Sequence, residues 1–238
     1  MRISRLLLIT GTLALLSVTL WAVTASRSYV APKIAAGEVK ISKVCMVPAA
    51  AQLKRVGVKG QEGMAKESDN WSLQLQNIVE NHLKQAGAEI TPSNMSSDEL
   101  QENPDLQAAL LNVQQRYDTV AQQLDKKSQD VKKGRYTLGD EVTLLPCSAK
   151  SDALVFVHGQ GNVLTSGKKA FGTLIGGASR STAYLRVSFV DAKTGDVLAY
   201  SYFLNTGDFE TDSEKAYGKK LKKEFEKMGI GTFTAKKK

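Results

Sequence analysis

Residues 184–203 read YLRVSFVDAKTGDVLAYSYF, and this stretch decides the fold. Its first half alternates strictly, which indicates a strand with one apolar and one polar face. Apolar side chains alternate there with polar ones: Leu185, Val187 and Phe189 point inward, Arg186 and Ser188 outward. Asp191, Thr194 and Gly195 supply the chemistry of a tight turn and are predicted to be structural. An apolar run then returns over 197–203, so the sequence predicts a β-hairpin.

The segments on either side of the hairpin extend this prediction. Upstream, residues 152–158 form an apolar run typical of a buried central strand. Between the central strand and the hairpin, residues 159–177 are rich in glycine and favour a loop. Downstream, apolar residues spaced along 211–228 predict a final helix that ends before Gly229.

The N-terminal half adds two strands and two helices to this prediction. A first strand is expected over 39–47, followed by a glycine-containing loop over 49–68 and a helix built on Trp71, Leu75 and Leu83. A short strand over 88–91 follows. Ser96 and Glu99 form a capping-box pattern. A long amphipathic helix over 104–133 comes next, and it is expected either to lie along its own domain or to pair with a helix of another subunit.

Together these elements predict one α/β (α+β) domain. Its single mixed sheet is largely antiparallel and is covered by two or three helices, with the 104–133 helix as an insertion. We place the domain at 38–229, a linker at 26–37 and a basic tail at 230–238.

The N-terminus has the sequence pattern of an export signal. Arg2 and Arg5 precede an apolar run over 6–23, and small residues follow at 23–25. This pattern predicts either a cleaved signal peptide over 1–25 or a retained inner-membrane anchor, and a periplasmic location in both cases. The net charge of +8 is concentrated towards the C-terminus, where it favours contact with anionic membrane or glycan and not with nucleic acid.

The chain has two cysteines, Cys45 and Cys147. An oxidising compartment allows a disulfide between them, and two buried free thiols are the alternative. Cys147 and His158 lack a third group to orient the imidazole, and the two histidines lack the spacing of metal ligands. No catalytic centre, metal or cofactor is predicted.

One apolar stretch lies within the glycine-rich segment and is a candidate interaction surface. It consists of Phe171, Gly172, Leu174, Ile175, Gly176 and Gly177. Glycines beside apolar residues allow close approach to a partner, a membrane or another copy of the chain. A homo-oligomer is therefore one of the expected possibilities. A flexible connection between strands is the alternative.

The segments Asp152–Val157 and Leu185–Leu198 resemble the core shared by the TolB N-terminal domain, the curli-secretion lipoprotein and the penicillin-binding-protein activator lipoproteins. The chain departs from that group by lacking a lipidated cysteine and by its long helix. The resemblance implies a non-enzymatic module that binds envelope proteins. The alternative is a ligand- or glycan-binding domain, with a cleft between the Gly57–Gly63 loop and the sheet edge lined by Trp71 or Tyr136.

Overall fold

The computed structural model describes residues 27–174, 176–177, 180–207, 209 and 211–230. They contain one mixed sheet in the order β1-β8-β7-β6-β2-β5, with β3 also paired to β6 and β4 paired to β3. The strands are β1 Arg27–Val30, β2 Lys43–Met46, β3 Ala50–Gly57, β4 Gly60–Gly63, β5 Glu89–Thr91, β6 Ala153–Leu164, β7 Thr182–Asp191 and β8 Val197–Thr206. The pairs β6–β7, β7–β8 and β1–β8 are antiparallel, whereas β2 and β3 run parallel to β6. The predicted α+β class is confirmed.

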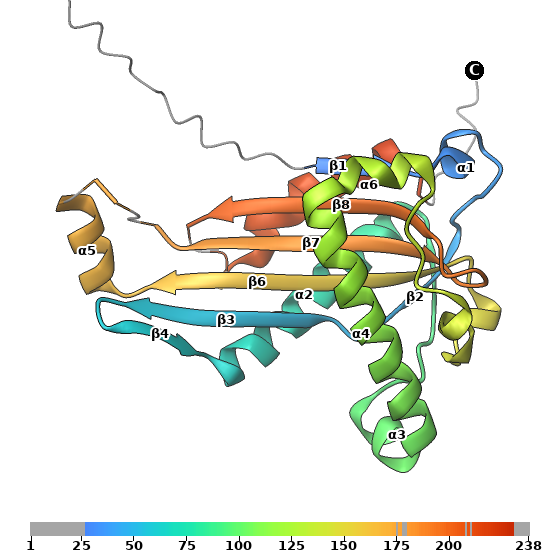
Figure 1. Ribbon diagram of the computed structural model, residues 1–238, viewed down its shortest axis with the longest axis horizontal. Coiled ribbons are helices and arrows are strands. Elements are labelled where there is room, and N and C mark those ends of the chain that lie inside the picture. Colours follow the sequence, from blue (N-terminus) through green and yellow to red (C-terminus); the bar gives the residue numbers. More distant parts are fainter. Residues whose placement is uncertain (1–26, 175, 178–179, 208, 210, 231–238) are drawn as a thin grey trace, which may run out of the picture.

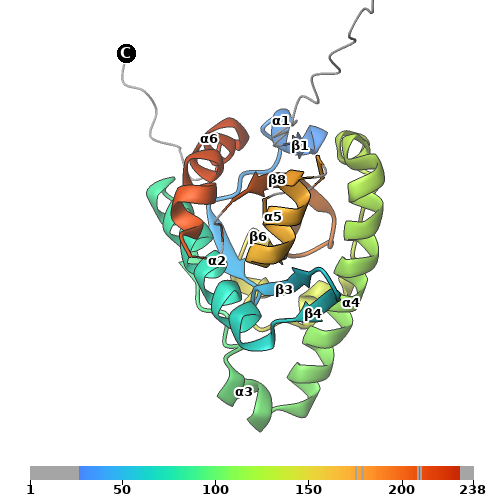
Figure 2. The ribbon, with the colours of Figure 1, turned by 90° about the vertical axis from the view of Figure 1, so that its left-hand side faces the viewer.

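Helices lie on both faces of this sheet, as Figures 1 and 2 show. The α-helices are α1 Pro32–Ala35, α2 Ala65–Gln85, α3 Ser97–Glu102, α4 Pro104–Lys127, α5 Ser166–Leu174 and α6 Lys219–Met228. Short helical turns are η1 Ser128–Lys133, η2 Asp140–Leu144, η3 Ser148–Lys150 and η4 Glu214–Gly218. One apolar core lies between the sheet and α2 with α6, and a second lies between the sheet and α4. The sheet is therefore the middle of three layers.

The predicted hairpin is β7 and β8, paired from Thr182↔Thr206 to Val190↔Val197. Leu185, Val187 and Phe189 are fully buried in the core under α2 and α6, as expected. Arg186 and Ser188, expected outward, are buried as well. They face the second helical layer, because α4 packs over that side of the hairpin.

The long helix packs on its own sheet. Leu110, Val113, Tyr117 and Leu124 of α4 are buried in the second core. The α-helix ends at Lys127, and residues 128–133 continue as η1 instead of as the predicted helix. The apolar seam is thus used within the chain.

The segment predicted as a linker over 26–37 contains β1 and α1. β1 pairs with the edge of β8, with Tyr29 opposite Tyr200. Lys33 of α1 binds Asp191 and Asp196 of the β7–β8 turn at Nζ–Oδ2 distances of 3.4 and 2.9 Å. The sequence predicts a linker here because no local pattern marks a strand among these small polar residues. The segment is structured through backbone pairing with β8, which is distant in the sequence.

The loop predicted over 49–68 is the β3–β4 hairpin and the first turn of α2. β3 lies on β6 from Ala50↔His158 to Val56↔Leu164. Where β4 does not reach, the backbone N–H groups of Ala51 and Leu53 donate to Ser72 Oγ and Ser68 Oγ of α2, at 2.9 and 2.8 Å. Hydrogen bonding from a helix thus completes a strand that has one fully buried apolar residue, Leu53.

The glycine-rich stretch is also more ordered than predicted, because β6 runs to Leu164. A Cβ on Gly159 would lie 2.6 Å from Leu75 and 2.9 Å from Trp71, and one on Gly161 would lie 2.6 Å from Phe209. These glycines leave room for large side chains to pack on the strand. Upstream of β6, residues 142–144 are part of η2, and Val142 and Leu145 are buried in the second core.

Candidate functional site

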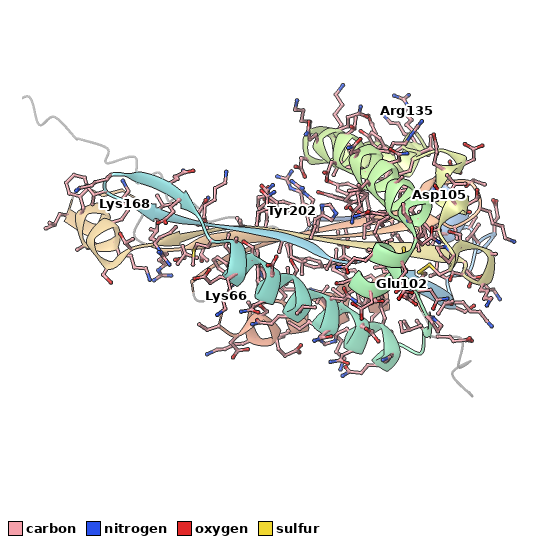
Figure 3. The ribbon with its side chains drawn as sticks, turned by 90° about the horizontal axis from the view of Figure 1, so that it is seen from below. Lys66, Glu102, Asp105, Arg135, Lys168 and Tyr202 are labelled. Carbon is pink, nitrogen blue, oxygen red and sulfur yellow. A yellow bond between two sulfur atoms is a disulfide. The ribbon has the colours of Figure 1, made fainter. Side chains whose placement is uncertain are left out.

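α4 covers only part of its sheet face and leaves the rest open, as Figure 3 shows from below. Two adjoining hollows of about 230 and 380 Å³ lie on this open face and share Gln52, Gln160 and Tyr184. We call them together the open groove. Its floor is lined by Gln52, Lys54, Gln61, Gln160, Asn162, Thr182, Tyr184 and Leu204, and its end against α4 by Asp118, Gln122, Asp125, His158 and Arg186.

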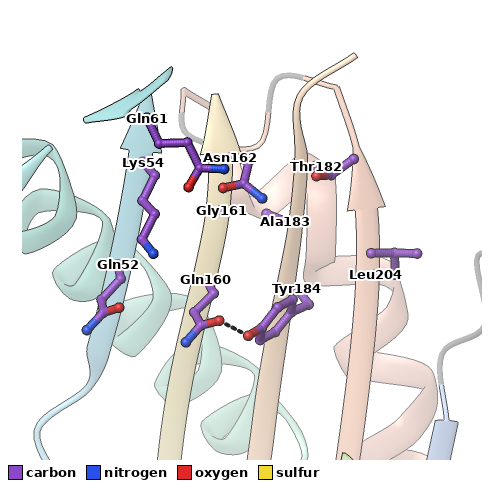
Figure 4. Close-up of a pocket in the computed structure, with 10 residues that line it drawn as sticks. All are labelled: Gln52, Lys54, Gln61, Gln160, Gly161, Asn162, Thr182, Ala183, Tyr184 and Leu204. Atoms are coloured by element: carbon purple, nitrogen blue, oxygen red, sulfur yellow. Dashed lines mark hydrogen bonds between the residues drawn. The ribbon is translucent and has the colours of Figure 1, made fainter. Parts of the chain in front are cut away.

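Strand register arranges the floor in two parallel rows (Figure 4). Gln52, Gln160, Tyr184 and Leu204 are paired in turn across β3, β6, β7 and β8. Two residues further along, Lys54, Asn162, Thr182 and Thr206 form the second row. Because side chains alternate between faces, Leu53 between Gln52 and Lys54, and Ala183 between Thr182 and Tyr184, face the core instead of the groove.

The aromatic part of the floor is held on several sides. The Tyr184 hydroxyl donates to Gln160 Oε1, and the Tyr184 ring stacks on Tyr202 at 5.4 Å between ring centroids. The Arg186 guanidinium lies over the same ring, 4.6 Å from its centroid. The position of the ring is therefore fixed by its neighbours within the chain.

A charged network closes the α4 end of the groove. Arg186 forms a bidentate ion pair with Asp125 of α4, with Nε donating to Oδ1 at 2.9 Å and Nη2 donating to Oδ2. Tyr200 donates to the same Oδ1 at 2.9 Å. Burial raises the pKa of the Tyr200 hydroxyl, and the neighbouring Asp125 carboxylate raises it further. Asp125 is thus an occupied acceptor that fixes α4 on the sheet.

His158 lies beside this network, between Tyr117 and Asp118. Its ring centroid is 4.5 Å from that of Tyr117, and its Nδ1 is 3.4 Å from Asp118 Oδ1. Burial and the Arg186 charge lower the pKa of His158 to about 4, and burial raises the pKa of Asp118. At neutral pH the imidazole is uncharged, so the His158–Asp118 contact is not an ion pair.

This burial predicts a pH-dependent stability. Between pH 7 and pH 5, His158 is expected to lower the free energy of unfolding by roughly 2 kcal/mol, because the unfolded chain binds a proton near pH 6.5 and the folded chain only near pH 4. Urea unfolding of the wild type and of His158→Gln at both pH values measures the difference. The variant should lose that part of the pH dependence, and an equal pH dependence in both proteins would contradict the assignment.

The predicted site residues lie outside the groove. Cys45 of β2 and Cys147, just before η3, form a disulfide with a Cα–Cα distance of 6.0 Å. Asp191 Oδ1 accepts from the backbone N–H groups of Lys193 and Thr194, at 2.9 and 3.1 Å. Gly195 has a positive φ of 73° and packs on the backbone of Gly139. The disulfide and the turn are therefore structural features.

The candidate surface over 171–177 begins in the last turn of α5 and continues past its end. A loop was predicted here, so the helix is a correction. Phe171 and Leu174 are exposed, Gly172 is buried, and Gly176 and Gly177 are exposed after the helix. Ile175 lies outside the described residues. Trp71 and Tyr136, either of which would have favoured the ligand-binding alternative by lining a pocket, are both buried in the cores.

The described residues hold neither a metal-binding cluster nor a candidate membrane span. Within them, no three His, Cys, Asp or Glu side chains are close enough together to bind a metal ion. No helix in the same residues is long and apolar enough to cross a bilayer. The predicted signal or anchor over 1–25 and nearly all of the predicted basic tail lie outside the described residues, whereas Ile230, the first residue of that tail, is buried in the core.

The fold and groove define an α+β domain with a mixed sheet and one partly open face. No protein-family model and no curated protein matches the chain. Among solved structures, it is similar to the PelC dodecamer from Paraburkholderia phytofirmans, with a TM-score of 0.41 and 11% identity over 87% of this chain and 97% of that one. The structure of a point variant of that dodecamer is similar as well, with a TM-score of 0.41 and 10% identity over 87% of this chain and 98% of that one.

Proposed function

We propose that this chain is a non-catalytic binding domain of the cell envelope and that the open groove binds an extended, uncharged glycan. The observation that carries the proposal is the pair of polar rows across β3, β6 and β7. The N-terminal export pattern and the disulfide between Cys45 and Cys147 support an envelope location, because disulfides persist in oxidising compartments.

The composition of the groove favours sugar over protein as the ligand. Four of its floor residues, Gln52, Gln61, Gln160 and Asn162, carry amides, which both donate and accept hydrogen bonds as sugar hydroxyls do. The half-buried Tyr184 ring adds apolar surface beside these amides. Protein interfaces instead centre on buried apolar or aromatic anchors, whereas this floor is more polar than apolar.

The charged end of the groove supports binding without turnover. Both Asp125 oxygens accept hydrogen bonds from Arg186, and Oδ1 also accepts one from Tyr200. His158 is uncharged at neutral pH. Cys147, the thiol considered as a nucleophile, is bonded to Cys45. We therefore expect an added oligosaccharide to be recovered unchanged.

The test is calorimetric titration with the uncharged oligosaccharides cellohexaose and chitohexaose. Gln52→Ala/Gln160→Ala is expected to weaken binding about tenfold, because two hydrogen bonds of about 0.7 kcal/mol each are lost. Gln101→Ala/Gln107→Ala removes two exposed amides elsewhere and should bind as the wild type does.

Three outcomes would overturn the proposal. They are the absence of binding to every glycan, equal affinity of the two double variants, and mass-spectrometric detection of cleaved oligosaccharide. Capture of an envelope protein that depends on Gln52 and Gln160 would establish the protein-contact function in its place.

A further inference from the structure

α5 exposes its large apolar side chains to solvent, unlike an ordinary surface helix. Its apolar residues Phe171 and Leu174, three positions apart and so on one face, are 47% and 83% exposed. The residue that α5 buries is Gly172. Surface helices normally bury their apolar stripe and expose their polar one. Here the apolar face points away from the domain.

A second apolar group lies beside this helix, on the turn between β3 and β4. Val58 in that turn is 65% exposed. The turn is held next to the start of α5, because Thr165 donates its backbone N–H to Val56 at 3.1 Å. Figure 2 shows α5 and the β3–β4 hairpin together at the end of the sheet that faces the viewer. We call Val58, Phe171 and Leu174 the apolar tip.

Cations flank the apolar tip. Lys59 follows Val58, and Lys168 and Lys169 lie in the first turn of α5, with Lys168 labelled at the extreme end of the molecule in Figure 3. Neither the turn over 57–60 nor α5 contains Asp or Glu. Lysines beside exposed apolar side chains are the pattern of segments that enter the interface of an anionic membrane.

We infer that the apolar tip docks on an anionic lipid surface. Three side chains cannot supply the roughly 800 Å² per partner that a stable protein interface buries, so a second copy of the chain fits the tip poorly. Shallow insertion into lipid needs only a few apolar side chains, and the lysines supply the attraction to anionic headgroups. This surface is separate from the open groove.

The test places a fluorescent reporter at the tip of the full chain. Leu174→Trp, in a chain that also carries Trp21→Phe, is mixed with vesicles of equal parts phosphatidylglycerol and phosphatidylcholine. We expect its emission to shift to the blue and to be quenched by brominated lipid, with neither change on pure phosphatidylcholine. Leu73→Trp, at an exposed leucine of α2, is the matched control and should show neither change.

A second variant tests the charges. Lys168→Glu/Lys169→Glu, added to the Leu174→Trp reporter, is expected to weaken the vesicle response at least tenfold, since each basic residue near such a surface contributes about 1 kcal/mol. No response at position 174, or an equal response at position 73, would overturn the inference. A blue shift that appears with protein concentration in the absence of lipid would assign the tip to a second copy instead.

Discussion

Replacing Cys45 and Cys147 together by alanine is expected to lower the free energy of unfolding by about 4 kcal/mol. The disulfide closes a loop with a sequence separation of 102 residues, and cross-linking so long a loop removes much of the entropy of the unfolded chain. Urea unfolding of the oxidised wild type and of the double variant measures the difference. Both cysteines are buried, so a small packing loss adds to the entropic effect.

Reduction of the wild type separates these two contributions. When urea unfolding is carried out in dithiothreitol, the free energy of unfolding of the wild type should fall nearly to that of the double variant. The remaining difference reports the packing of the two sulfur atoms. The double variant itself should not respond to dithiothreitol. Equal midpoints for the wild type with and without reductant would show that the disulfide does not constrain the unfolded chain.

Replacing Asp125 by alanine is expected to cost about 2–3 kcal/mol. The Arg186 side chain, 11% exposed, would keep its charge without a partner, and Tyr200 would lose its acceptor. The expected loss lies below that for fully buried pairs because the Asp125 side chain is 32% exposed. Urea unfolding at pH 7 in low and high salt measures it.

The control for this pair is a double-mutant cycle. Asp125→Ala/Arg186→Met removes the stranded charge together with its partner, so it should cost less than the sum of the two single variants. Strict additivity would mean that Asp125 and Arg186 are not coupled and that their ion pair does not help to hold α4 on the sheet.

Elements with a buried apolar stripe could be predicted from the sequence. The β7–β8 hairpin, α2 and α4 all show the periodicity of one covered face. The start of α3 was also predicted, because a capping box is a local interaction: Ser96 and Glu99 exchange hydrogen bonds of 2.7 and 3.3 Å. Such signals depend on residues close in sequence and need no knowledge of the fold.

Elements that depend on distant partners could not be predicted. β1 is ordered by the free edge of β8, and β3 by β6 and by serines of α2. α5 has two glycines and exposes its apolar face, so neither propensity nor periodicity favours a packed helix there. The sequence pattern is misleading where tertiary contacts replace local preference.

The open groove escaped prediction for a similar reason. Gln52 and Lys54 lie in a segment expected to be a loop, and Gln160 and Asn162 lie among glycines. Gly159 and Gly161 hide the alternation of β6, because the core on their side is filled by Trp71, Leu75 and Phe209 from elsewhere in the chain. Only parallel pairing of β3 with β6 brings the amides into rows.

Because side chains alternate along β6, substitutions in this strand and insertions or deletions in it have different effects on the protein. Substitutions at Gln160 or Asn162 alter the surface of the open groove and leave the core untouched, so this surface can diverge among descendants of this sequence at little cost in stability. Insertion or deletion of one codon between Val157 and Asn162 would exchange the two faces of the strand, turning amides into the core and apolar packing into the solvent. Lineages should therefore vary this strand by replacement and hold its length constant.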